Sequence, residues 1–262
     1  QPNINQNDKL DFSKLETNYK KLVELSFKNK EDLLNTSENL IIFWPETAVL
    51  NINHLNSYPI FKKLNTNLKE KEYVITGIFR NEEKDIYYNS ILIIDKNLSL
   101  NFVYDKIHLV PFGEYIPGKE TLESLLPFTL DVISRIPIKT VSGKFPKTIT
   151  LEKISPFSPQ ICFESLFNRW ISSAPQKPKW ILNLTNDAWF GDTVGPRQHL
   201  RLCQFRAIQE NLPVVRVAAT GISAIIDNHG RLIKQLGYNK KGVIDFNNAS
   251  INLAPTLKSK NP

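Results

Sequence analysis

The sequence predicts an α/β fold in which two mixed sheets pack face to face under outer helices. Short β-rich segments alternate with amphipathic helical segments, which favours parallel strand pairs. Tight turns join other β-rich segments, which requires antiparallel pairs. The 262 residues, 41% of them hydrophobic, can bury one large core, so we expect a single domain over residues 1–262.

The N-terminal half is expected to begin with a helix and to continue in short strands. Apolar side chains recur at three- and four-residue spacing from Phe12 to Phe27, which is typical of an amphipathic helix. Residues 61–71 are expected to form a charged surface helix, and residues 95–97 a hairpin turn. Buried or half-buried strands are predicted at 40–43, 73–79, 89–94 and 98–104.

The C-terminal half is expected to alternate strands with helices. A short helix is predicted over residues 164–172, and a long one begins at Pro196 and ends near Asn211, where Pro213 follows. The tripeptide at 228–230, Asn-His-Gly, predicts a hairpin turn. Strands are predicted at 148–154, 160–163, 180–184, 213–218, 223–226, 232–235 and 243–246.

The composition narrows the class of protein. No run reaches the roughly 18 to 20 apolar residues of a membrane span, and the polar N-terminus lacks the apolar stretch of a signal peptide. The net charge of +7 reflects the Lys- and Asn-rich composition or a face that attracts an anionic membrane, and no motif indicates a nucleic-acid partner. Because the sequence contains no methionine, we expect a fragment or processed form, from which a targeting segment or a membrane anchor can be missing.

Three reactive side chains follow short β-rich segments, where a packed sheet passes its chain to a loop. Cys162, Glu46 and Lys106 supply a thiol, a carboxylate and an amine. Together at one sheet edge they make a nucleophile, a base and an electrostatic stabiliser. Each also has an ordinary alternative: an inert core cysteine, a carboxylate in an ion pair and a solvated loop lysine. The hypothesis is that these three side chains lie close together in the folded chain.

The sequences around these residues resemble a known superfamily. Trp44-Pro45-Glu46, the stretch from Tyr104 to Pro117 and Cys162-Phe163-Glu164 resemble the Glu-Lys-Cys carbon–nitrogen hydrolases, or nitrilases. The stretch 185–199, with Asn-Asp-Ala-Trp-Phe-Gly, is similar to the apolipoprotein N-acyltransferase branch. The resemblance covers nearly the whole chain and implies a nitrilase-like four-layer α-β-β-α sandwich.

The resemblance also implies roles for the three reactive residues. It makes Cys162 the nucleophile and Glu46 its general base. Lys106 would hold the negative charge of the tetrahedral intermediate, together with the backbone N–H of Phe163.

Further residues take supporting roles by the same resemblance. Glu114 would position the lysine, and Glu164, beside the nucleophile, would support the site. Trp189 would lie near the site entrance and contact substrate. The resemblance implies no cofactor and no metal, and His108 and His199 lack metal-ligand spacing. His108 is expected to brace its loop by hydrogen bonding.

The reaction that the resemblance implies is a two-stage acyl transfer. A phospholipid gives its acyl chain to the cysteine, and the α-amine of a lipoprotein's N-terminal diacylglyceryl-cysteine then accepts it. Family enzymes carry membrane helices outside this domain, so we expect it on the periplasmic side of a bacterial inner membrane. Anchoring to that membrane surface favours a monomer.

The apolar segment 117–147, which prolines interrupt, is too apolar for a disordered loop. One hypothesis is that Leu125, Leu126 and Phe128 contact lipid; the alternative is a loop packed on the sheet. Cys203 is expected to be a core residue, and both cysteines are expected to be free thiols.

Two other functions remain open. The first is a soluble nitrilase-type amidase that hydrolyses a small amide with the same three residues. The second is a non-catalytic binding module of the same fold. The intact reactive residues argue against the binding module, and the Asn-Asp-Ala-Trp-Phe-Gly motif favours lipid over a small amide.

Overall fold

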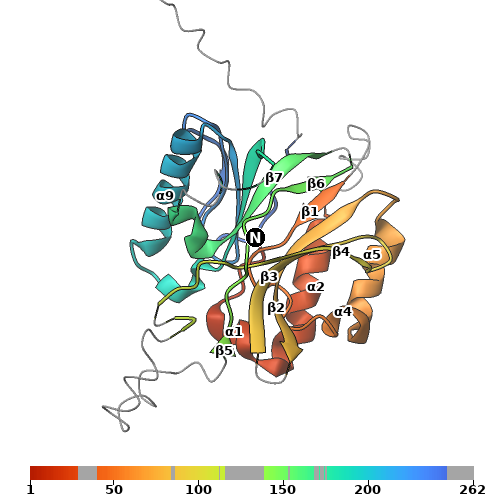
Figure 1. The fold of residues 1–262 in the computed structure, drawn as a ribbon. Coiled ribbons are helices and arrows are strands. Elements are labelled where there is room, and N and C mark those ends of the chain that lie inside the picture. Colours follow the sequence, from red (N-terminus) through yellow and green to blue (C-terminus); the bar gives the residue numbers. More distant parts are fainter. Residues whose placement is uncertain are drawn as a thin grey trace, which may run out of the picture.

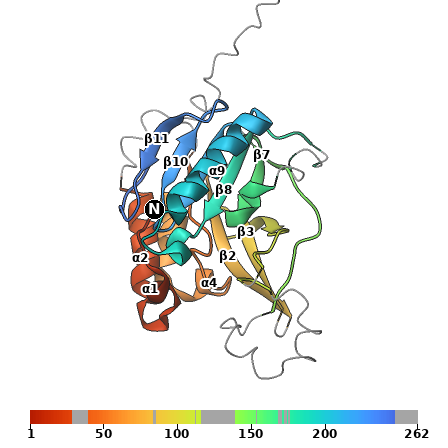
Figure 2. The same cartoon turned by 90° about the vertical axis from the view of Figure 1, so that its left-hand side faces the viewer.

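Two β-sheets lie face to face between two layers of helices in the computed structural model (Figure 1). On one side lie α2 (Leu15–Ser26), α4 (His54–Ser57) and α5 (Lys62–Asn67), and α9 (Gly195–Glu210) covers the other (Figure 2). The predicted α-β-β-α layering is therefore confirmed. The structure describes residues 1–28, 40–83, 86–111, 113–115, 139–152, 154–167, 171, 174 and 176–246.

The first sheet has the strand order β1-β2-β3-β4, with β5 paired to β3. Its strands are β1 (Ile41–Phe43), β2 (Tyr73–Glu83), β3 (Ile86–Ile94), β4 (Leu100–Asp105) and β5 (Lys139–Thr140). The pairs β1/β2 and β3/β5 are parallel, and β3 is antiparallel to both β2 and β4. The mixed character expected from the hairpin at 95–97 is confirmed.

The second sheet has the order β11-β10-β9-β8-β7-β6. Its strands are β6 (Ile149–Leu151), β7 (Ile154–Ile161), β8 (Trp180–Thr185), β9 (Val214–Ala218), β10 (Ser223–Ile226) and β11 (Leu232–Leu236). The three central strands β7, β8 and β9 are parallel, and the outer pairs are antiparallel. The segments that leave the three parallel strands therefore start at one edge of the sheet.

Alternation along the strands divides the core into three apolar clusters. In β2, Ile75 packs between the sheets, whereas Val74 and Ile78 pack under the helices of the first side. In β8, Leu182 lies between the sheets and Ile181 packs under α9. Both faces of each sheet are thus buried, as parallel strands require.

Several element boundaries differ from the predictions. The strand β7 runs unbroken from Ile154 to Ile161 and contains Pro156 and Pro159. Because proline argues against a central strand, the sequence did not predict this full length. Cys162 follows that strand and opens the 3-10 helix η3 (Cys162–Leu166), where we predicted a strand end and then a helix.

Other differences lie outside that strand. The surface helix predicted over 61–71 is shorter, as η2 (Pro59–Phe61) followed by α5. Residues 243–246 form no strand. The helix predicted from Pro196 is confirmed as α9, and Asn211, in the left-handed conformation with φ of 53°, ends it.

Candidate active site

Glu46 leaves the first sheet directly after β1, on a loop that lies against β2. The amide of Gly77 donates to the carbonyl of Pro45 at 3.2 Å. A Cβ on Gly77 would lie 2.5 Å from the Cα of Glu46, so only glycine permits this approach. The backbone of Glu46 is therefore held on the edge of the sheet.

The carboxylate of Glu46 is bound from both sheets. It is 5% exposed. Its Oε1 accepts a hydrogen bond from Asn89 Nδ2 of β3 at 2.7 Å, and its Oε2 accepts one from the backbone N–H of Asn186, just after β8, at 2.7 Å. These two donors fix its orientation.

Lys106 follows β4 and forms a buried charged cluster with Glu46 and Glu114, which we call the Lys106 cluster. Its Nζ, in a side chain 1% exposed, lies 2.7 Å from Glu114 Oε2 and 3.9 Å from Glu46 Oε1. Burial acts to lower the pKa of Lys106, but the charges of Glu46 and Glu114 outweigh it and raise that pKa above its ordinary value. Lys106 is therefore an ammonium throughout the neutral range.

Cys162 stands where β7 ends, with a left-handed backbone φ of 49°. The residue is partly exposed, and the charges of Glu46 and Lys106 both act on its thiol. Burial of the thiol and the charge of Glu46 raise its pKa to about 12, against the opposing effects of Lys106 and a hydrogen bond with Thr185. The structure thus brings the three reactive side chains together, with the thiol protonated at rest.

Glu164 ties the segment after Lys106 to the segment before Cys162. Its Oε1 accepts from the backbone N–H of Ile107 at 2.7 Å, and its Oε2 from that of Ile161 at 2.7 Å. The hydroxyl of Tyr104 lies 2.9 Å from Oε1. Burial raises the pKa of this carboxyl, and the backbone donors act against that rise. The carboxylate therefore sets the separation between the lysine and the cysteine.

Glu114 and His108 lie in the segment that follows Lys106. Glu114 Oε2 also accepts from the backbone N–H of Val110 at 2.8 Å, and its Oε1 accepts from Asn89 Nδ2 at 3.0 Å. The backbone N–H of His108 donates to Glu164 at 3.2 Å. This segment is thus bound to both glutamates.

Lys9 is a buried residue of the site that the sequence reasoning missed. It lies on α1 (Gln6–Leu10), is 8% exposed, and its Nζ donates to the backbone carbonyl of Glu46 at 2.9 Å and to the hydroxyl of Thr47. Burial lowers the pKa of Lys9 to about 8, against the charges of Glu46 and Cys162. No signal in the sequence marks it, because a lysine in a short polar helix is ordinarily solvated.

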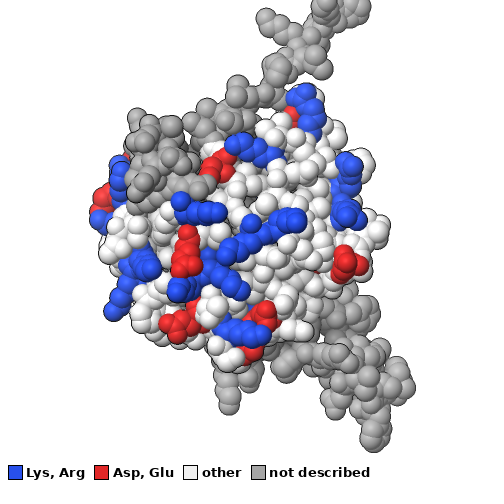
Figure 3. Space-filling model, turned by 180° about the vertical axis from the view of Figure 1, so that it is seen from behind, with Lys and Arg blue, Asp and Glu red and all other residues white. Residues whose placement is uncertain are grey.

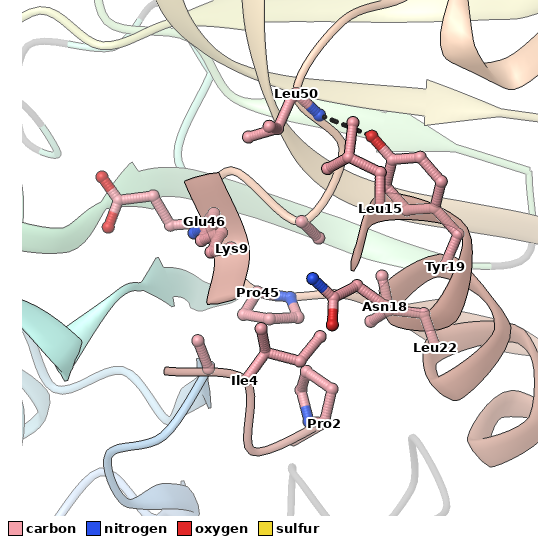
Figure 4. Close-up of a pocket in the computed structure, with 12 residues that line it drawn as sticks. Pro2, Ile4, Lys9, Leu15, Asn18, Tyr19, Leu22, Pro45, Glu46 and Leu50 are labelled. Atoms are coloured by element: carbon pink, nitrogen blue, oxygen red, sulfur yellow. Dashed lines mark hydrogen bonds between the residues drawn. The ribbon is translucent and has the colours of Figure 1, made fainter. Parts of the chain in front are cut away.

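A narrow apolar cavity lies beside Lys9 and Glu46. Figure 4 shows the Glu46 carboxylate pointing away from Pro45, Ile4 and the other apolar lining residues. The lining does not include Cys162 or Lys106. Of the three reactive residues, only Glu46 therefore lines this cavity.

A second buried charged cluster comes from the second sheet, and we call Asp187, His199 and Arg216 the Arg216 cluster. Arg216 Nη2 donates to Asp187 Oδ2 at 2.7 Å, and His199 Nδ1 lies 2.9 Å from Asp187 Oδ1. Burial acts to raise the pKa of Asp187, but Arg216 and His199 lower it to about 2. The Asp-Ala-Trp-Phe-Gly motif and His199 were singled out in the sequence, but no sequence pattern indicated that Asp187 pairs with His199 and Arg216.

The remaining predicted site residues are placed less centrally. Trp189, in η4 (Asp187–Phe190), is 66% exposed and close in sequence to Asn186, which binds Glu46. The ring of Phe163 packs edge-on against Phe167, with centroids 5.5 Å apart. Cys203 is buried and both cysteines are free, as expected. The predicted lipid-contact residues Leu125, Leu126 and Phe128 lie outside the described residues.

The surface gives two further observations. Lys and Arg side chains spread over the face in Figure 3, with Asp and Glu between them, so this face carries no uniformly basic stripe. Within the described part of the chain, every helix falls short of the length and apolar character needed to cross a membrane.

Comparison with known proteins agrees with the predicted resemblance. Curated relatives named apolipoprotein N-acyltransferase include one from Sinorhizobium fredii, 38% identical over 210 residues, which are 78% of this chain and 39% of the relative. Another, from Rhodopseudomonas palustris, is 32% identical over 275 residues, covering 99% of this chain and 49% of the relative. The chain thus spans half or less of the length of these relatives.

A solved amidase has a similar fold, and a family profile matches nearly the whole chain. The NitN amidase from Nesterenkonia sp. superposes with a TM-score of 0.59 at 14% identity, over 90% of this chain and 89% of the amidase. This likeness confirms the predicted nitrilase-like fold. The sequence profile of the carbon–nitrogen hydrolases matches residues 3–251. The chain therefore belongs to the carbon–nitrogen hydrolase family.

Proposed function

We propose that this chain is the catalytic part of an N-acyltransferase that moves a fatty acyl chain from a phospholipid to a lipoprotein. The acceptor is the α-amine of the N-terminal diacylglyceryl-cysteine. One observation carries the proposal: the thiol of Cys162 lies in the joint field of Glu46 and Lys106, which come from the opposite sheet. The name that the curated relatives share supports the choice of substrates.

In the first stage, Glu46 accepts the thiol proton of Cys162, and the sulfur attacks the ester carbonyl of the phospholipid. The oxyanion of the tetrahedral intermediate is stabilised by the ammonium of Lys106 and the backbone N–H of Phe163. The ester C–O bond then breaks, and Glu46 returns the proton to the departing lysophospholipid oxygen. An acyl thioester remains on Cys162.

In the second stage, the lipoprotein amine attacks the thioester carbonyl and gives its proton to Glu46. Lys106 again holds the oxyanion, and Glu114 holds Lys106 at 2.7 Å in both stages. The C–S bond breaks, the amide leaves and the proton returns to the sulfur. At the end of the second stage, Cys162, Glu46 and Lys106 are back in their starting protonation states.

The surroundings of the site follow from this chemistry. Water must be excluded from the thioester, or the domain becomes a hydrolase. We place the domain on the periplasmic side of a bacterial inner membrane, as a monomer at the membrane surface. Trp189 at the exposed η4 and the segment holding Leu125, Leu126 and Phe128 would then meet acyl chains.

A soluble amidase is the second candidate, because the solved structure with a similar fold is an amidase. The same three residues would attack a small amide and release ammonia. The sequence Asn186 to Gly191 and the relatives' shared name favour the acyltransferase instead.

One experiment distinguishes the acyltransferase from the amidase. The chain is incubated with phosphatidylethanolamine vesicles, and its intact mass and tryptic peptides are measured. The acyltransferase predicts an acyl adduct on the peptide with Cys162, none on that with Cys203, and its loss on adding a diacylglyceryl-cysteine lipopeptide. The Cys162→Ala variant is the matched control. Release of ammonia from small amides with no adduct from phospholipid would make the chain an amidase.

A further inference from the structure

The Arg216 cluster lies against Cys162 without touching its reactive atom. Cys162, His199 and Asp187 are the residue types of a cysteine–histidine–aspartate triad. However, His199 Nε2 lies 3.2 Å from the carbonyl oxygen of Cys162. An imidazole hydrogen-bonded to the main-chain oxygen is not the base for the thiol. The pair therefore needs another explanation.

The carbonyl of Cys162 collects three buried side-chain donors. Ser165 Oγ, Asn183 Nδ2 and His199 Nε2 each lie 3.2 Å from it. Because a carbonyl oxygen only accepts, Nε2 of His199 carries a proton to bind it, and the Asp187 carboxylate, which also only accepts, requires a proton on Nδ1. The left-handed φ of 49° is uncommon for a residue with a side chain and costs free energy. The three donors offset that cost and fix the direction in which the cysteine side chain leaves the backbone.

Asp187 also reaches the sulfur side of the same residue. Its Oδ1, which contacts His199, accepts from Thr185 Oγ1 at 3.1 Å. The same hydroxyl is within hydrogen-bonding reach of the Cys162 sulfur, and its single proton can turn from Asp187 to the sulfur when the thiol ionises, which lowers the pKa of the thiol. One carboxylate oxygen therefore orients both the donor at the carbonyl and the hydroxyl at the sulfur.

Asp187 itself is fixed in place. Arg216 Nη2 binds its Oδ2 at 2.7 Å, and a Cβ on Gly221 would lie 2.0 Å from that oxygen. Arg216 also donates to Asn183 Oδ1 at 2.7 Å, and Asn183 is another donor to the Cys162 carbonyl. The whole arrangement is buried and bound on both sides.

We propose that Asp187 and His199 are positioning residues that hold Cys162 in its left-handed conformation, with the sulfur facing Glu46 and Lys106. This inference rests on the proposed function only for the identity of the nucleophile. His199 neither takes nor gives a proton in the reaction. It acts through the carbonyl of Cys162, and Asp187 acts through His199 and Thr185.

The test compares two neutral replacements of one histidine. The amide of His199→Gln reaches the position of Nε2 and keeps the donor to the Cys162 carbonyl. The amide of His199→Asn reaches the position of Nδ1 and keeps only the contact with Asp187. The measured quantity is the rate at which iodoacetamide alkylates Cys162 across a pH series. Peptide mass spectrometry separates Cys162 from Cys203.

We expect His199→Asn to slow alkylation about tenfold and to move the pH midpoint of the rate, and His199→Gln to stay within about threefold of the wild type. His229→Asn, at an exposed turn, controls for loss of a histidine and should change nothing. Equal rates and pH profiles for the two His199 variants would overturn the inference, whether those rates are fast or slow.

A second pair keeps the test decisive if a His199 variant fails to fold, which thermal melting reports. Thr185→Ser keeps the hydroxyl at the sulfur and should retain the wild-type pH profile, whereas Thr185→Val should raise the pH midpoint. Identical profiles would again overturn the inference. Alkylation needs no phospholipid, so a clear contrast without an acyl adduct would defeat the proposed function and leave this inference standing.

Discussion

Two buried clusters of charge meet at Cys162, one from each sheet, and they differ in how completely their charges are paired. In the Arg216 cluster, both oxygens of Asp187 have partners, at 2.7 Å and 2.9 Å. In the Lys106 cluster, Lys106 binds Glu114 at 2.7 Å but lies 3.9 Å from Glu46, too far for a hydrogen bond. Lys106 and Glu46, the looser pair, are also the two groups whose charges act most strongly on the Cys162 thiol.

This difference indicates a division of labour. A buried cluster whose groups are all satisfied resists movement and fixes geometry. A cluster that leaves an ammonium and a carboxylate close but not hydrogen-bonded keeps both available to a third group, which in the proposed reaction is the substrate carbonyl. Variants of the Lys106 cluster should therefore change the rate of acylation, and loss of Arg216 from the Arg216 cluster should change stability.

The largest effect is expected from Glu46→Gln, which keeps the shape of the side chain and removes the base. The acylation rate should fall by about 10²–10⁴-fold, the range that a positioned general base supplies. The burst of nitrophenol from a p-nitrophenyl acyl ester measures this rate. The exposed Glu70→Gln is the matched control. A burst of wild-type speed in Glu46→Gln would remove Glu46 from the mechanism.

Arg216→Met tests the other cluster. It leaves the carboxylate of Asp187 buried without its main partner, so the free energy of unfolding should fall by about 3–5 kcal/mol. Arg231→Met is the matched control, because the Arg231 side chain is exposed and Asp227 keeps its backbone donors, so the loss should cost about 1 kcal/mol or less. Urea titration of both variants checks this. Equal losses would show that the burial of the Arg216 cluster contributes nothing.

Lys106→Met should raise the barrier to acylation by about 3 kcal/mol, because the oxyanion loses its ammonium. The same nitrophenyl burst measures it, with Lys71→Met, which breaks a surface ion pair with Glu152, as the control. Near-wild-type acylation by Lys106→Met would show that the assigned oxyanion role is wrong.

The smallest effect concerns Lys9. Its pKa is about 8 in the folded chain against 10.5 ordinarily, so between these values the unfolded state binds more protons and stability rises with pH. Compared with Lys9→Met, the wild-type chain should gain about 2 kcal/mol of unfolding free energy by about pH 9.5. Urea titrations at several pH values check this, and taking the difference cancels the titration of Cys162. Parallel pH curves for the two proteins would contradict the shifted pKa.

The sequence predicted the three reactive residues and missed two residues that bind main-chain oxygens. Cys162, Glu46 and Lys106 each follow an apolar strand and lie in recognisable motifs. Lys9 and His199 bind the main-chain oxygens of Glu46 and Cys162. Any residue has such an oxygen, so no pattern of side chains marks the contact.

The fold shows a similar limit. Layers, strand alternation and the long helix α9 followed from apolar periodicity. The extent of β7 did not, because Pro156 and Pro159 break the local preference while both neighbouring strands enforce the extended chain. That strand end sets the position of Cys162. The sequence therefore predicted the end of β7 to within two residues and missed its start.

The most direct measurement is a double-variant cycle on the acylation rate, using wild type, Glu46→Gln, Lys106→Met and the variant with both changes. If the two residues act as one unit on Cys162, the double variant should be about as slow as the slower single variant. If the two losses multiply in full, Glu46 and Lys106 act independently, and the shared site described here is contradicted.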